Sequence, residues 1–199
     1  MDWVGLDVRS FEVGERVFGF NRHRFGTYAQ YVCWPEDGLL ARRPVNLTDE
    51  EAVAVAYGGL LALHFLRKAD VRAGQRVLVY GASGAVGTSA VQLARHIGGE
   101  VTGVCSTANV DLVASLGASM VVDYTIEDFT DREERYDLIF DAVGKRKSAA
   151  ALRRCRQLLA PGGAYVSVDH GTPQLRHEDL VSPAAPATKG LIRPVTART

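Results

Sequence analysis

A glycine-rich stretch at residues 80–87, Tyr-Gly-Ala-Ser-Gly-Ala-Val-Gly, constrains the fold of this chain more than any other feature. The run before it, Arg76-Val77-Leu78-Val79, is apolar after Arg76 and rich in β-branched valine, as is typical of a buried strand. The run after it, residues 88–97, places its apolar residues near helical spacing. The stretch is therefore predicted to be a tight turn that joins a buried strand to a helix.

Such a turn is suited to a phosphate ligand. Glycines let the backbone pass close to a bound group, and the first N–H groups of the following helix lack partners within that helix. These N–H groups and the positive end of the helix dipole favour a negative charge. The alternative is an ordinary tight turn without a ligand. The flanking strand and helix favour the first interpretation and predict a dinucleotide site.

The length and the charge of the chain limit the classes of protein to which it can belong. The chain has 199 residues, enough for one domain or for one domain with part of another. Lys plus Arg and Asp plus Glu both number 23, so no overall field attracts nucleic acid or an anionic membrane. The longest apolar stretch, residues 52–66, is interrupted and too short for a membrane span. We therefore expect a soluble protein with neither nucleic-acid nor membrane partners.

The three cysteines, Cys33, Cys105 and Cys155, are widely spaced and odd in number. This pattern argues against a disulfide framework and for a reducing compartment. We expect a cytoplasmic location, with an organellar one left open. No cysteine or histidine has a partner at the spacing of a zinc site, so we expect no metal. Ser83 lacks the glycine placement of a nucleophile elbow, so we do not expect a serine hydrolase.

The first 70 residues predict short strands followed by a helix. Residues 13–19 and 26–32 alternate apolar positions with glycine bends and predict two β-strands. Thr48 and Glu51 have the spacing of a capping box, so a helix is predicted to begin there. Gly58 and Gly59 are expected to break this helix before a second helical piece at residues 60–68.

From residue 75 onward, strands and helices alternate, which is typical of a parallel sheet covered by helices. Proline, glycine and charge mark the connections, and the pattern fails after Asp169, where four prolines follow. Residues 191–195 are at best one further edge strand. We predict strands at residues 77–80, 100–105, 120–123, 137–141 and 164–168, helices at 109–116 and 148–159, a turn at 161–163, a solvated acidic loop at 127–134 and solvated basic clusters at 145–147 and 153–156.

The end of the second predicted strand bears on the choice of cofactor. In a dinucleotide-binding βαβ unit, an acidic side chain at this point binds the 2′-hydroxyl of NAD. Here the sequence is Cys105-Ser106-Thr107, which would not repel a 2′-phosphate and offers hydroxyls to it. This favours NADP. The alternative is that Ser106 and Thr107 only cap the next helix.

Ligands of such sheets bind beyond the carboxyl ends of the strands. That rule nominates Tyr124, Val143 and Gly144, and Asp169-His170, as further pocket residues. Tyr124 either contacts the nucleotide or packs at the edge of the core.

Several stretches, taken together and in order, resemble the medium-chain dehydrogenase/reductase superfamily, in its zinc-free quinone oxidoreductase-like branch. The resemblance extends from about residue 13 to residue 169. The matching stretches are residues 11–19 (FEVGERVFG), 26–32 (GTYAQYV), 80–88 (YGASGAVGT), 90–94 (AVQLA), 104–107 (VCST), 115–118 (SLGA), 122–124 (VDY) and 161–163 (PGG).

The resemblance implies an α/β fold with a Rossmann-type doubly wound parallel sheet and a partial GroES-like β-barrel segment at the N-terminus. It implies NADPH-dependent reduction of quinones or α,β-unsaturated carbonyls, with no metal, and pairing into a homodimer. Residues 1–48 would be the barrel remnant, 49–172 the Rossmann domain, and 173–199 an irregular tail with a possible last edge strand. By this resemblance, Ser83, Gly84, Ala85 and Val86 would hold the diphosphate, Ser106 would face the 2′-phosphate, and Tyr124 would contact the adenosine phosphate region. The strand-end rule adds Val143 and Gly144 to the predicted cofactor site.

The sequence departs from the family pattern at several positions. Ala108-Asn109 stand where many members carry a basic residue for the 2′-phosphate, and Leu61 replaces a threonine near the nicotinamide. Much of the barrel is missing at both ends, so we expect a truncated or degenerate member. No catalytic residue is identified. Two hypotheses follow, an active reductase and a catalytically impaired NADP-binding or interaction module.

Overall fold

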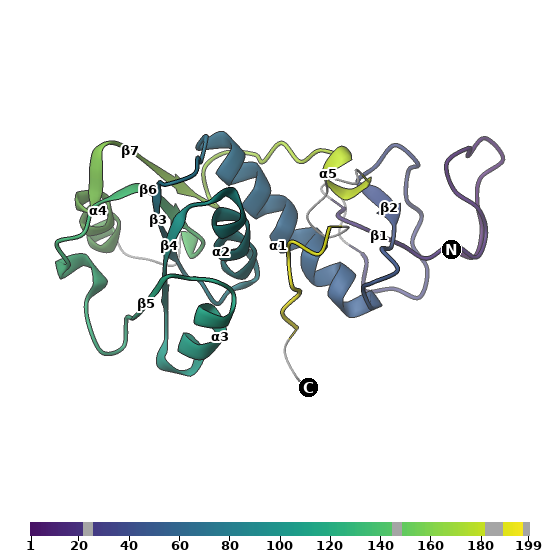
Figure 1. Ribbon diagram of the computed structural model, residues 1–199. Coiled ribbons are helices and arrows are strands. Elements are labelled where there is room, and N and C mark those ends of the chain that lie inside the picture. The colour runs from purple at the N-terminus through teal and green to yellow at the C-terminus, as the bar shows by residue number, and fades with distance from the viewer. Residues whose placement is uncertain (22–25, 145–148, 182–188, 197–199) are drawn as a thin grey trace.

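A parallel β-sheet organises the larger part of the molecule. The computed structural model describes residues 1–21, 26–144, 149–181 and 189–196. Within them, five strands form one parallel sheet in the order β5-β4-β3-β6-β7 (Figure 1). Their bounds are β3 Arg76–Tyr80, β4 Glu100–Cys105, β5 Met120–Asp123, β6 Tyr136–Asp141 and β7 Leu159–Ser167. The predicted α/β class and the predicted parallel strands are confirmed.

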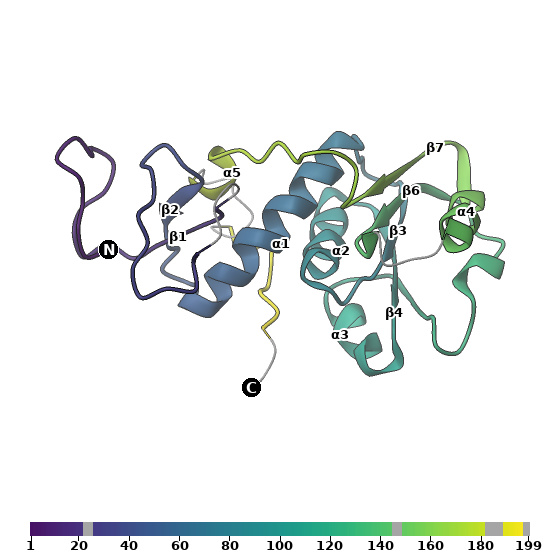
Figure 2. The ribbon, with the colours of Figure 1, turned by 180° about the vertical axis from the view of Figure 1, so that it is seen from behind.

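Helices cover both faces of this sheet. Side chains of a strand alternate between the two faces, so an apolar strand has residues to bury on each of them. Val77 and Val79 of β3 pack into a core with helices α1, α2 and α3, whereas Leu78 packs into a second core with Cys155 and Leu158. Figures 1 and 2 show α1, α2 and α3 on one side of the sheet and α4 on the other. The helices are α1 Asp49–Lys68, α2 Ala85–Ile97, α3 Val110–Ser115 and α4 Ala149–Gln157, with 3-10 turns η1 Thr107–Asn109 and η2 Phe129–Asp131.

The order of the strands defines one special point at the sheet edge. The chain leaves β3, passes through α2 and returns as β4 on one side of β3, and later places β6 on the other side. The carboxyl end of β3 is therefore the topological switch point, where sheets of this kind open a crevice for ligands. The glycine-rich stretch of residues 80–87 lies at this point.

Helix α1 begins as the sequence predicts but does not break. Thr48 Oγ1 accepts from Glu51 N at 3.3 Å, and Thr48 N donates to Glu51 Oε2 at 2.8 Å, so the capping box is formed. The predicted break at Gly58-Gly59 is wrong, because α1 is continuous from Asp49 to Lys68. A Cβ on Gly58 would lie 2.1 Å from the carbonyl oxygen of Ala85, so this glycine permits close packing of α1 on α2.

We predict that Gly58→Ala destabilises the protein despite the higher helix propensity of alanine. The clash with a backbone oxygen should outweigh a propensity gain of about 1 kcal/mol and lower the free energy of unfolding by about 1–3 kcal/mol. Gly59→Ala is the matched control, because its Cβ would meet only the side-chain ends of Ile192 and Val55 at 3.2 Å. Chemical denaturation measures both. Equal or higher stability of Gly58→Ala would contradict the close packing.

The segment before α1, residues 1–48 and here called the N-terminal unit, contains a small antiparallel sheet beside the start of α1. Strands β1 Val17–Gly19 and β2 Leu40–Arg42 pair with each other. The first predicted strand is thus partly confirmed, but residues 26–32 form bends and no strand, so the second prediction is wrong. The partner strand comes from later in the chain. Arg16 and Arg43 both bond Asp49, at 2.6 and 2.9 Å, and so tie this unit to the first turn of α1.

The chain after β6 differs in detail from the predictions. Strand β7 begins at Leu159 and includes Pro161-Gly162-Gly163, which were predicted as a turn; a register shift between Tyr136 and Leu138 accommodates them. A short helix, α5 Glu178–Val181, was not predicted. Among residues 189–196 the structure has no strand, so the predicted edge strand at residues 191–195 is wrong. The tail packs on helices instead: Arg193 N donates to Gln92 Oε1 at 2.7 Å, and Ile192 is buried.

Other predictions concern the helical connections. The 109–116 helix is found as η1 followed by α3, and the acidic loop contains only η2. Arg153, Arg154 and Arg156 lie exposed on α4 around the buried Cys155, as predicted. Residues 145–147 and the proline-rich stretch 182–188 lie outside the described residues. No helix in the described part of the chain combines the length and apolarity that crossing a bilayer demands.

Candidate functional site

The turn between β3 and α2 is built by close backbone contacts. Gly81 has φ 81°, in the region that favours glycine, and its carbonyl oxygen accepts from Gly84 N at 3.1 Å. A Cβ on Gly87 would lie 2.1 Å from the same carbonyl oxygen. The first turn of α2 is therefore pressed against the end of β3, with Gly84 as its N-cap.

The turn presents unused hydrogen-bond donors. Gly84 supplies no side-chain cap to α2, and no acceptor within the described residues receives the N–H groups of Ser83, Ala85 or Val86. Gly84 and Ala85 are exposed, Ser83 is half-buried and Val86 is buried. Free donors at the N-terminus of a 13-residue helix form an electropositive point at the switch point of the sheet.

Hydrogen bonds join this turn to the neighbouring strand ends. The N–H groups of Gly81 and Ala82 donate to Val104 O at 3.1 and 2.9 Å, so the turn lies beside the end of β4. Tyr124 N donates to Cys105 O at 3.0 Å, which places Tyr124, 53% exposed, next to Ser106.

The end of β6 meets the turn from the other side. A Cβ on Gly81 would lie 2.7 Å from Val143 Cγ2, so the Val143 side chain covers Gly81. Gly144 in turn lies against Asp169, because a Cβ there would be 2.5 Å from Asp169 Oδ2. The eight residues predicted for the cofactor thus lie along one edge of the sheet, around Gly81.

Ser106 is the first residue after β4 and precedes the 3-10 turn η1. Its hydroxyl accepts from Asn109 Nδ2 at 3.0 Å, and its carbonyl accepts from Asn109 N at 2.9 Å. It makes no side-chain cap to η1. Having accepted one bond, the Ser106 hydroxyl retains its proton to donate to a ligand at this edge.

Two residues that the sequence did not single out hold the loop after β6. Asp141, 1% exposed, accepts from Val143 N at 3.1 Å and Gly144 N at 3.2 Å through Oδ1, and from Tyr165 Oη at 2.6 Å through Oδ2. Burial raises the pKa of Tyr165, with the nearby Cys155 adding to the effect. The sequence signal that could have pointed to Asp141 is its place as a charged residue at the carboxyl end of the predicted strand 137–141. The pair fixes the loop whose Val143 side chain covers Gly81.

We predict that Tyr165→Phe lowers the free energy of unfolding at pH 7 by about 1–3 kcal/mol, because it removes a hydrogen bond to a buried carboxylate. The pH dependence should change as well. Since the pKa of Tyr165 is raised on folding, its contribution is present below the unfolded pKa of about 10 and is lost as the pH rises further. The variant should therefore lose stability less steeply above pH 10.

Denaturation from pH 7 into the alkaline range measures this difference. Tyr28→Phe is the control, because Tyr28 is fully exposed. It should change stability by less than about 0.5 kcal/mol and leave the alkaline slope unchanged. The Asp141–Tyr165 bond has no such role if Tyr165→Phe behaves like the control.

A zinc site was tested on the described cysteines and histidines. Cys33 is exposed, whereas Cys105 and Cys155 are buried. His64 and His177 bond backbone carbonyls, of Gln174 at 3.2 Å and Gly38 at 3.0 Å. His64 is partly buried. Within the described ranges no three metal-binding side chains cluster, so these residues do not fit a zinc ion.

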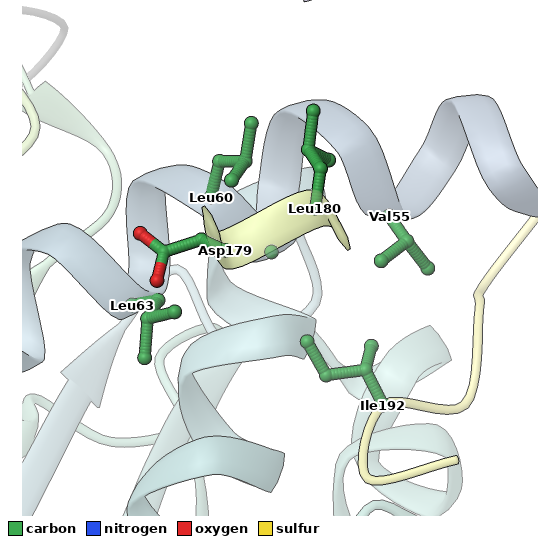
Figure 3. Close-up of a pocket in the computed structure, with 7 residues that line it drawn as sticks. Val55, Leu60, Leu63, Asp179, Leu180 and Ile192 are labelled. Carbon is green, nitrogen blue, oxygen red and sulfur yellow. The ribbon is translucent and has the colours of Figure 1, made fainter. Parts of the chain in front are cut away.

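A separate apolar cavity lies between α1, α5 and the C-terminal tail. It is lined by the apolar residues Val55, Leu60, Leu63, Leu180 and Ile192 (Figure 3). Asp179 also lines it, and its carboxylate bonds Arg67 at 2.7 Å. The cavity has a volume of about 10 Å³, room for about one water molecule, so it is a packing feature and no substrate pocket.

The strand order and the turn at the switch point define a Rossmann-type α/β fold. The chain belongs to the zinc-binding dehydrogenase family, whose model matches residues 85–188, and within it to the quinone oxidoreductase-like members of the medium-chain dehydrogenase/reductase superfamily. The resemblance found in the sequence is thereby confirmed.

Three similar proteins illustrate the relationship. The chain is 35% identical over 172 residues to 2-methylene-furan-3-one reductase of Solanum lycopersicum (82% of this chain, 42% of that protein). It is 32% identical over 174 residues to the chloroplastic NADPH-dependent alkenal/one oxidoreductase of Arabidopsis thaliana (83% and 43%). The quinone oxidoreductase structure from Coxiella burnetii aligns with a TM-score of 0.75 at 30% identity (83% and 52%). The chain spans about half the length of these relatives.

Proposed function

We propose that this chain forms the dinucleotide-binding part of an NADPH-dependent oxidoreductase that transfers hydride to a quinone or an α,β-unsaturated carbonyl, independently of zinc. The observation that carries the proposal is the β3–α2 turn. In this turn, the N–H groups of Ser83, Ala85 and Val86 have no acceptor in the described part of the chain, and they lie at the switch point of the sheet. A diphosphate satisfies donors of this kind.

The substrate class is supported by the relatives. Their names include an NADPH-dependent alkenal/one oxidoreductase, a 2-methylene-furan-3-one reductase and a quinone oxidoreductase. Bound NADPH would supply the hydride, and the protein would orient it against a carbonyl-bearing small molecule. No residue of this chain is assigned as a proton donor.

Each predicted site residue has a place in this proposal. The turn residues hold the diphosphate, Ser106 donates to the 2′-phosphate, and Tyr124 contacts the adenosine phosphate region. The loop of Val143 and Gly144, fixed by Asp141, lies beside Gly81 and would contact the dinucleotide there. Zinc independence rests on the described cysteines and histidines, which offer no converging set of ligands.

The organisation of the protein is part of the proposal. Residues 49–172 would act as the Rossmann unit, residues 1–48 as a GroES-like segment, and residues 173–199 as a tail. Strands β5 and β7 are edge strands of the described sheet, and pairing of such an edge would give a homodimer. Three cysteines without a disulfide suit a cytoplasmic location, with an organellar one left open.

A second candidate function is a catalytically impaired NADP-binding or interaction module. It is supported by Leu61, which is buried in α1 and has no hydroxyl to offer a nicotinamide, and by the small N-terminal sheet, in which each described strand has three residues.

Calorimetric titration with NADPH tests the dinucleotide site. We expect binding by the wild type and a loss of about tenfold or more in affinity for Ala85→Glu, because the new carboxylate lies among the free N–H groups. Glu in the first turn of a helix does not destabilise the fold. Ala114→Glu, on the exposed side of α3, is the control with the same charge change. Absence of binding at millimolar NADPH would contradict both candidate functions.

Oxidation of NADPH in the presence of quinones and enals then separates the two candidates. Turnover above background across the panel, lost in parallel with binding in Ala85→Glu, supports the reductase. Tight binding without turnover of any member of the panel supports the impaired module and rejects the reductase.

A further inference from the structure

One acidic residue lies beside the proposed 2′-phosphate subsite. Asp123 is the last residue of β5 and pairs in parallel register with Cys105, the residue before Ser106. It therefore stands at the carboxyl edge of the sheet, one strand away from the turn that begins with Ser106. In the sequence the end of β4 carries no carboxylate, but the neighbouring strand supplies one to the same edge.

Hydrogen bonds hold this carboxylate in place. Asp123 Oδ1 accepts from Thr125 N at 2.9 Å and from Thr125 Oγ1 at 2.7 Å. The Thr125 hydroxyl has one proton, which this bond uses, so the contact of 2.8 Å between the Thr107 and Thr125 hydroxyls has Thr107 as its donor. The hydroxyl proton of Thr107 is thus used within the cluster of Thr107, Thr125 and Asp123, which leaves the hydroxyl of Ser106 as the donor to a ligand there.

The charge of Asp123 is also present at neutral pH, and no cation of the described residues forms an ion pair with it. Hydrogen bonding to Thr107 and Thr125 lowers the pKa of Asp123. Among the ion pairs of the described residues none involves Asp123, in contrast to Asp128, which pairs with Arg154. Oδ2 of Asp123 is shielded from solvent, so the carboxylate acts on a nearby anion through its field and not by direct contact.

We propose that Asp123 is a specificity-determining residue, whose uncompensated carboxylate weakens binding of the 2′-phosphate and so narrows the preference for NADPH over NADH. The proposal rests on the proposed function, since it requires the dinucleotide to lie along this edge. A 2′-phosphate beside Ser106 carries about two negative charges close to Asp123, whereas the 2′-hydroxyl of NADH carries none. The carboxylate therefore acts on one cofactor and leaves the other nearly unaffected.

Asp123→Asn tests the proposal, because the amide keeps an acceptor for Thr125 and removes the charge. The affinities for NADPH and for NADH are measured by calorimetry, each at low and at high ionic strength. We expect NADPH to bind about fivefold tighter to the variant at low salt, with a smaller gain at high salt and a change of less than about twofold for NADH.

Asp137→Asn is the matched control. Asp137 is also a partly buried strand aspartate that accepts a hydrogen bond, from Arg76 N at 2.8 Å, but it lies at the amino end of β6, the opposite edge of the sheet. The Asp137→Asn variant has the same change in net charge and should leave the ratio of NADPH affinity to NADH affinity unchanged. Thermal unfolding of both variants with and without NADH separates a folding defect from a change in specificity.

Each outcome decides the matter. A rise in NADPH affinity confined to Asp123→Asn and reduced by salt supports the proposal. Equal changes for NADPH and NADH, no change, or the same shift in Asp137→Asn overturns it while leaving the dinucleotide site intact. Binding of neither dinucleotide by the wild type contradicts the proposed function itself, and this inference with it.

Discussion

The close approach of backbones around the β3–α2 turn is the constraint on which the rest of the structure depends. Gly87 brings the first turn of α2 against the carbonyl of Gly81, and Gly58 brings α1 against the carbonyl of Ala85. A side chain at either position would meet a backbone oxygen at 2.1 Å, which no rotamer change relieves. The two contacts bring α1, α2 and the end of β3 together, and the N–H groups of Ser83, Ala85 and Val86 at the start of α2 keep no acceptor among the described residues.

The electrostatic environment of a ligand differs between two regions of this edge. At the turn, free N–H groups and the helix dipole favour an anion. At the ends of β4 and β5, the hydroxyl of Ser106 lies near the carboxylate of Asp123, and the structure gives that carboxylate no cationic partner among the described ion pairs. On the other side of the turn, at the end of β6, the buried Asp141 fixes the backbone of Val143 and Gly144 through hydrogen bonds. A dinucleotide along this edge would meet attraction at its diphosphate and a weaker, mixed environment at its 2′ position.

Much of this arrangement could be predicted from the sequence, because it rests on local pattern. The apolar runs predicted the parallel strands, and Thr48 and Glu51 predicted the start of α1. The break at Gly58-Gly59 was wrong because propensity describes an isolated helix, whereas tertiary packing on Ala85 requires a glycine there. The strand at residues 26–32 and the edge strand at residues 191–195 failed for a similar reason, since pairing depends on partners distant in sequence. Asp141, Tyr165 and Asp123 were missed because the strand order brings their partners together.

Binding of a dinucleotide across the β3–α2 turn can be tested by amide hydrogen exchange followed with and without NADPH. We expect saturating NADPH to slow exchange of the amides of Ser83, Ala85 and Val86, and to a smaller degree those after β4 and β6, while the N-terminal sheet around β1 and β2 changes least. Binding of NADPH with unchanged exchange in the turn, or with protection centred on another part of the chain, would contradict it.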